Sequence, residues 1–111
     1  MKTISIKDLS IAECIYLAED LISVLDCRAR NDNEFDTSDE IVKENLKKAP
    51  ILLDMIGWHK EAETLKKITL DNISEFKDFL YDLEFMCLPN VGDYPNQIRY
   101  DLFADDIKIE Y

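Results

Sequence analysis

The chain has few of the residues on which special turns, metal sites and redox chemistry depend. Its 111 residues include 2 glycines, 3 prolines, 3 cysteines and 1 histidine. This composition excludes collagen-like and low-complexity chains, and the length favours one compact domain covering residues 1–111. Cys14, Cys27 and Cys87 form no CxxC pair and no zinc pattern, which favours a reducing, cytoplasmic location. Cys14 and Cys87 fall on apolar stripes and are expected in the core.

Signals for export, membrane insertion and catalysis are also absent. The N-terminus lacks the apolar run and cleavage site of a signal peptide, and no uncharged stretch is long enough to span a bilayer. There is no glycine-rich phosphate loop, nucleophile elbow or HExxH zinc motif. The acidic run that starts at Asp32 fails the calcium-loop pattern, because Thr37 and Lys43 replace the required glycine and glutamate. We therefore expect no enzyme, no cofactor and no metal.

Positive charge is scarce in this chain. It has 24 acidic residues against 13 lysines and arginines, and its formal net charge is -11. The acids are concentrated in residues 19–42 and 68–111, whereas residues 43–67 carry six lysines against four acids. Such a charge argues against direct binding of nucleic acid or an anionic membrane, because phosphate binding needs lysine and arginine. It favours a basic protein as partner.

Apolar residues recur at helical spacing through most of the chain. The first helix is predicted from about Ile11 to Ala29, and Ser10 with Glu13 forms a capping box at its start. A second capping box, Thr37 with Glu40, predicts a helix that runs to about Lys48.

Proline and glycine divide the middle of the chain. Pro50 is expected to end or kink the second helix and to begin a short new one. Gly57 is the predicted stop of that short helix, and residues 58–68 resume the helical period. A third cap, Asn72 with Glu75, precedes a regular amphipathic helix that should end near residue 88, before Pro89.

The tail changes to a two-residue period. Apolar residues alternate with polar ones over 98–102 and again over 107–111, which predicts a β-hairpin. A short helix over Gln97–Phe103 is the alternative for its first half, and Ile4 with Ile6 suggests a third strand. The expected fold is mainly α (α+β): a compact bundle of about four to five helices with a small C-terminal β-hairpin. Its core should include Leu21, Leu25, Phe76, Leu80, Leu83.

Two acidic segments are candidate partner-binding surfaces. In the first, carboxylates surround an aromatic residue that belongs to no apolar stripe: Asp32, Glu34, Phe35, Asp36, Asp39, Glu40. The rival surface lies in the C-terminal third: Asp93, Tyr94, Asp101, Asp105, Asp106. An aromatic ring that fills a pocket, with carboxylates engaging arginine or lysine around it, is a plausible anchor. The alternative is that Phe35 packs onto the core and that the acids are only solvated.

Size, charge and the scarcity of catalytic groups favour a binding role. By analogy of composition alone, small acidic helical bacterial proteins often act as immunity proteins or antitoxins that cover the basic active site of a nuclease. We expect this function first. The alternatives are a phage anti-defence nucleic-acid mimic (anti-CRISPR or anti-restriction), and an acidic structural or adaptor domain without an inhibitory role.

Overall fold

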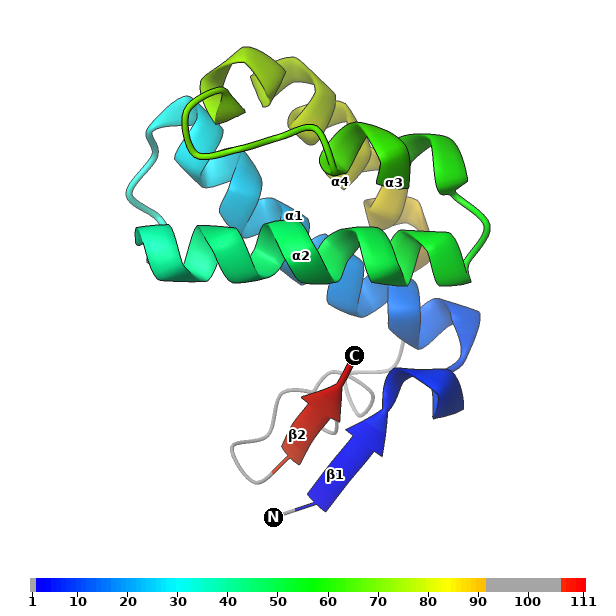
Figure 1. Ribbon diagram of the computed structural model, residues 1–111. Helices are drawn as coiled ribbons and strands as arrows, with labels where there is room; N and C mark the ends of the chain where they lie inside the picture. The colour runs from blue at the N-terminus through cyan, green and yellow to red at the C-terminus, as the bar shows by residue number, and fades with distance from the viewer. Residues whose placement is uncertain (1, 92–106) are drawn as a thin grey trace.

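Helix α1 (Ile11–Arg30) is the central element of the computed structural model, which describes residues 2–91 and 107–111. The predicted capping box is confirmed. The Ser10 hydroxyl accepts a hydrogen bond from the Glu13 amide at 3.1 Å, and the Glu13 carboxylate accepts one from the Ser10 amide at 3.0 Å. At its other end α1 stops at Asn31, whose φ of 58° is left-handed. Both α2 (Asp39–Met55) and α4 (Lys77–Val91) pack against α1 (Figure 1).

Helix α2 (Asp39–Met55) runs without interruption through Pro50, so the predicted break is wrong. Pro50 cannot donate a backbone hydrogen bond to the preceding turn. Its ring is nevertheless buried, and Leu52 and Leu53 beside it are fully buried, so packing offsets the lost bond. The predicted Thr37 cap is also wrong. Ser38 is the N-cap and makes no side-chain capping bond.

The predicted stop at Gly57 is confirmed. Gly57 has a φ of 86°, and its amide donates to the Asp54 carbonyl at 3.2 Å. The Trp58 amide donates to the Leu53 carbonyl at 2.9 Å. This pair of bonds is a Schellman motif, which glycine favours because it has no Cβ to clash at positive φ. The chain then enters the short helix α3 (His59–Leu65).

A 3-10 turn, η2 (Ile73–Phe76), leads into helix α4 (Lys77–Val91). The predicted Asn72 side-chain cap is wrong. The Asn72 side chain instead closes the preceding loop, accepting from the Thr69 amide at 2.7 Å and donating to the Lys67 carbonyl at 3.1 Å. Helix α4 also extends past its predicted end near residue 88 and runs through Pro89 to Val91.

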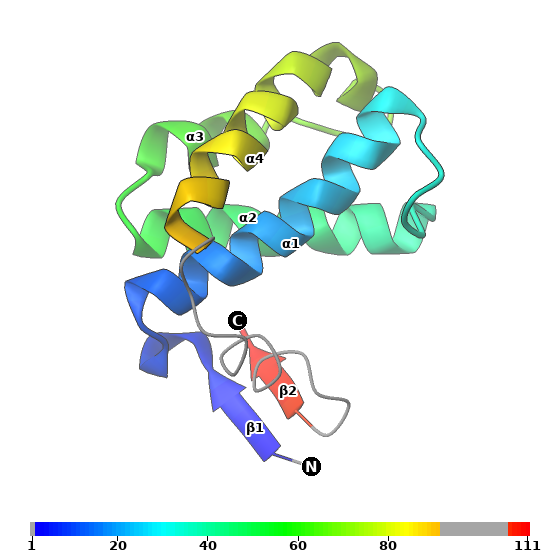
Figure 2. The same cartoon turned by 180° about the vertical axis from the view of Figure 1, so that it is seen from behind.

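The predicted strands at the two termini form one small sheet. Strand β1 (Lys2–Ser5) pairs in parallel with β2 (Ile107–Glu110), with Lys2 opposite Ile107. The 3-10 turn η1 (Ile6–Asp8) joins β1 to α1. The first half of the predicted hairpin, and its helical alternative, lie outside the described residues. Figures 1 and 2 both show the sheet at one end of the helical body.

The core is formed where α2 and α4 pack against α1 and where α3 packs against α2. Leu25, Leu80 and Leu83 are buried as predicted, whereas Leu21 and Phe76 are only partly buried. The mainly helical fold with a small terminal sheet is thus confirmed. In the described part of the chain, no helix combines the length and the apolar character that crossing a membrane requires.

Replacement of Leu80 by alanine tests this core. Leu80 is fully buried between α4 and α1, so Leu80→Ala should lower the free energy of unfolding by ~2–5 kcal/mol. Urea denaturation measures this change. The matched control is Ile51→Ala on the outer side of α2, which should change the free energy of unfolding by less than ~1 kcal/mol. Equal effects of the two substitutions would contradict the assignment of the core face.

Candidate functional site

The segment that joins α1 to α2, together with the first turn of α2, is held in place by hydrogen bonds; we call residues 31–40 the acidic loop. The Arg28 guanidinium on α1 donates to the Thr37 carbonyl at 2.6 Å and to the Asp39 carboxylate at 2.9 Å. The Asp32 carboxylate accepts from the Glu34 amide at 3.0 Å, and that of Asp36 accepts from the Ser38 amide at 3.0 Å. The loop therefore has a defined shape, because one arginine and two carboxylates tie its backbone.

Phe35 projects from this loop into solvent. Its exposed fraction is 42 %, and it is not among the side chains that pack against the core. Its neighbours Glu34 and Asp36 are exposed as well. An exposed aromatic ring between carboxylates is the arrangement that the sequence suggested for a partner-binding anchor.

The other predicted residues differ in whether their carboxylates are already engaged in an ion pair within the protein. Asp39 already forms an ion pair with Arg28, whereas within the described residues Glu34 and Glu40 form none. Asp39 and Glu40 also lie in the first turn of α2, where they complement the helix dipole. The rival surface lies wholly outside the described residues and stays a prediction: Asp93, Tyr94, Asp101, Asp105, Asp106.

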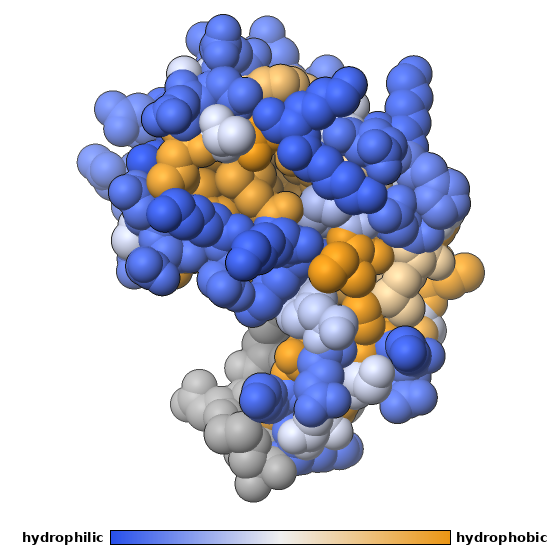
Figure 3. All heavy atoms as spheres, in the orientation of Figure 1, coloured by the Kyte–Doolittle hydropathy of each residue, from blue (hydrophilic) through white to orange (hydrophobic). Residues whose placement is uncertain are grey.

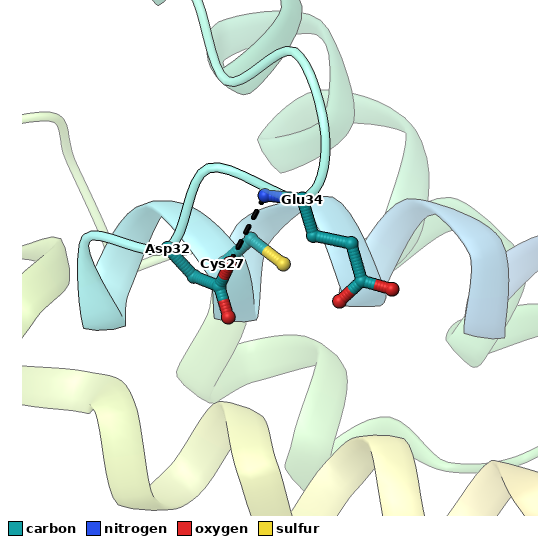
Figure 4. A group of neighbouring side chains, drawn as sticks. All are labelled: Cys27, Asp32 and Glu34. Atoms are coloured by element: carbon teal, nitrogen blue, oxygen red, sulfur yellow. Dashed lines mark hydrogen bonds between the residues drawn. The ribbon is translucent and has the colours of Figure 1, made fainter.

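Cys27 and two acids of the loop form a small group with metal-ligand chemistry (Figure 4). Cys27 on α1, Asp32 and Glu34 bring one donor atom each within 4.8 Å of one another, and the described residues contain no further group of this kind. Burial is the main cause that raises the pKa of the Cys27 thiol, and the two carboxylates raise it further. The uncharged thiol that results is a poor metal ligand.

A second polar cluster lies between α1 and α4. The Ser23 hydroxyl is 2.9 Å from a Glu19 carboxylate oxygen, 2.9 Å from the Glu19 carbonyl and 3.0 Å from a Glu84 carboxylate oxygen. Asp26, which is almost fully buried, receives two hydrogen bonds from Arg30 at 3.1 and 2.7 Å. The single Ser23 hydroxyl proton cannot be donated to all three of these oxygen atoms at once.

Glu84 is the carboxyl group of this cluster whose pKa is raised above its ordinary value. Burial raises the pKa of Glu84, and the neighbouring Asp26 and Glu19 raise it further, while the Ser23 hydrogen bond lowers it. Protonated Glu84 is able to donate a hydrogen bond to the Asp26 carboxylate. The cluster therefore joins α1 to α4 most firmly when Glu84 is neutral.

An exposed aromatic pair on α4 was missed by the sequence analysis. Tyr81 and Phe85 are 46 % and 52 % exposed, and their ring centroids are 4.7 Å apart. The Arg30 guanidinium lies 6.0 Å from the centroid of the Tyr81 ring, which links this pair to the end of α1. The available signal was that both aromatic residues lie off the apolar stripe of the helix. Met86, which the stripe included, is in fact exposed.

Comparisons with known proteins supply no relative for this arrangement. No protein-family model, curated protein or solved structure matches the chain. The function therefore has to be inferred from the residues themselves.

Thiol reactivity tests the burial of the cysteines. All three are buried, burial raises the pKa of Cys87 to about 12, and Cys14 is shifted in the same direction. In native protein we expect slow reaction with Ellman's reagent, since the thiolate is the reactive form. Cys27 should react first, because opening the acidic loop uncovers it without global unfolding. Rapid modification of Cys87 in the folded protein would contradict this burial.

The pH dependence of stability tests the Glu84 cluster. A raised pKa in the folded state means that the fold binds this proton more tightly than the unfolded chain. The stabilisation is complete below the unfolded-state pKa of Glu84 and is lost as pH rises through the folded-state pKa. Glu84→Gln keeps the neutral shape, so it should raise the free energy of unfolding at pH 7 relative to wild type and have little effect near pH 4. Urea denaturation between pH 4 and 8 measures this, and parallel pH profiles would rule the mechanism out.

Proposed function

We propose that this protein is a small acidic binding protein that neutralises a basic protein partner through the acidic loop. The observation that carries the proposal is Phe35, exposed between two carboxylates that form no ion pair within the described residues, on a loop that Arg28 ties in place. Because the loop is already ordered, binding costs less conformational entropy than it would for a free segment.

The chemistry of the loop matches a basic pocket. An aromatic ring that enters a pocket supplies apolar contact, and the carboxylates around it form charge-assisted hydrogen bonds with arginine or lysine. The acidic surface also attracts a basic partner before contact and raises the association rate. Tyr81 on α4 lines one pocket together with Arg30 and Asn31, so it offers a second aromatic contact where α1 ends and the acidic loop begins.

A nuclease toxin is the partner class that we favour, which makes the protein an immunity protein or antitoxin. Nucleases hold phosphate groups with lysine and arginine, and exposed carboxylates bind those same side chains when they cover the active site. A general nucleic-acid mimic fits less well, because lysines at positions 43, 47, 60 and 67 are exposed on and beyond α2. The acidic residues of the loop thus favour an interface confined to the loop over an acidic surface that covers the whole molecule.

Two substitutions in the loop test this proposal. Phe35→Ala should weaken binding by roughly thirtyfold, the effect of losing an anchor worth about 2 kcal/mol. Glu34→Lys should slow association and reduce its salt dependence. Neither side chain holds the loop together, so the melting temperature should change little. Glu110→Lys on β2 makes the same charge change at the far end of the molecule and should leave binding intact.

A toxin-sized reading frame immediately upstream of the gene would favour this role, and the product of such a frame is the partner to test. Titration of its nuclease activity with this protein gives the inhibition constant, and surface plasmon resonance gives the rates. Inhibition that is equal for wild type, Phe35→Ala and Glu34→Lys would mean that the acidic loop is not the interface. Absence of both binding and inhibition would refute a role in neutralising that nuclease.

A further inference from the structure

A groove with an apolar floor separates α2 from the loop that follows α3. Leu46 on α2 faces Ile68 and Leu70 across it, and its volume is about 460 Å³. Lys43 and Lys47 stand on its α2 side. Figure 3 shows this face of the molecule, with a hollow of hydrophobic residues above α2 and hydrophilic residues around it. The size lies within the range of natural binding clefts.

The lysines of the groove differ from other lysines nearby. Lys48 pairs with Glu44 at 3.4 Å, and Lys66 pairs with Asp54 and Glu63. Within the described residues Lys43 and Lys47 form no ion pair, although the chain has almost twice as many acids as bases. Two unpaired ammonium groups beside an apolar floor make this groove opposite in charge to the acidic loop.

We propose that this groove binds an acidic amphipathic helix of a partner protein. Lys43 and Lys47 are one helical turn apart, so their Cα atoms are separated by ~6 Å along α2. Carboxylates at positions i and i+4 of another helix have about the same separation. An apolar side chain on the same face of that helix then reaches the floor formed by Leu46, Ile68 and Leu70. Asp71 lies on the opposite side of the groove and repels carboxylates there. The bound helix is therefore oriented with its acidic residues toward α2.

The proposal is independent of the proposed function. The acidic loop attracts cations and the groove attracts anions, so the two sites select different segments. A second copy of this chain is a less suitable occupant than a foreign helix, because two molecules of net charge -11 repel each other. At physiological salt, charges are screened beyond ~8 Å, so the local lysines decide what binds in the groove.

The test is selection from a random library of 12-residue peptides displayed on phage. Selection on the wild-type protein is compared with selection on Lys43→Gln/Lys47→Gln, which removes both positive charges from the groove. We expect a set of peptides that is enriched only on the wild type. These peptides should carry aspartate or glutamate three or four positions apart, with an apolar residue on the same face. If no peptide depends on the two lysines, or if those that do lack acids, the proposal is wrong.

The most enriched peptide, labelled with fluorescein, then gives affinities by fluorescence anisotropy. Binding should fall ~10-fold or more with Lys43→Gln/Lys47→Gln, and further with Lys43→Glu/Lys47→Glu. The matched control is Lys7→Gln/Lys60→Gln, which removes two exposed lysines elsewhere and should retain binding within ~2-fold. Equal losses in control and groove variants would show nonspecific charge attraction and overturn the proposal. Circular dichroism confirms that each variant remains helical.

Sedimentation velocity over a range of concentrations tests whether a second copy of this chain occupies the groove. The wild-type protein should remain monomeric, which keeps the groove open for the peptide. Concentration-dependent dimers that disappear with Lys43→Gln/Lys47→Gln would identify a second copy as the occupant and refute a foreign helix. Basic peptides that bind wild type and groove variants alike report on the acidic loop, so failure at the groove is separable from failure of the proposed function.

Discussion

The packing of α1 between two helices is the constraint on which the rest of the structure depends. A helix with neighbours on both sides must bury more than one apolar stripe. On α1 the buried set therefore extends from Ile22 and Leu25 to Ser23 and Asp26. Buried polar groups need partners. Arg30 and Glu84 provide them, so the carboxylate cluster follows from the position of α1.

The end of α1 also determines the shape of the acidic loop. The left-handed Asn31 stops the helix and turns the chain into the acidic loop. Arg28, in the last turn of α1, then holds Thr37 and Asp39 and so positions the start of α2. The exposure of Phe35 is thus a consequence of how one helix ends. This coupling explains why a segment rich in charged residues has a defined shape.

Charge is divided between the faces of the molecule. The acidic loop and α4 carry exposed aromatic rings, and the loop is rich in carboxylates. On α2, by contrast, Lys43 and Lys47, which form no ion pair within the described residues, lie beside an apolar groove. A uniformly acidic surface would serve solubility alone. Two surfaces of opposite charge, each beside apolar groups, suit two different ligands. The acidic loop repels an acidic ligand, and the lysines of the groove repel a basic one.

The sequence by itself determined the features that depend on neighbours in the chain. The Ser10–Glu13 capping box, the stop at Gly57 and the acids around Phe35 could all be read from adjacent residues, because each rests on local hydrogen bonds or local charge. Where two local signals competed, packing decided. Pro50 stayed inside α2 because its ring is buried, and Asn72 turned back to the loop it closes instead of capping the next helix.

Only the tertiary structure decided which distant residues meet. The parallel pairing of β1 with β2 joins the two ends of the chain, and no local pattern encodes its direction. The Glu84 cluster, the exposure of Tyr81 and the groove beside Lys43 each combine residues from two elements. Their chemistry depends on how helices pack, and periodicity gives only the face of a helix, not the helix that it meets.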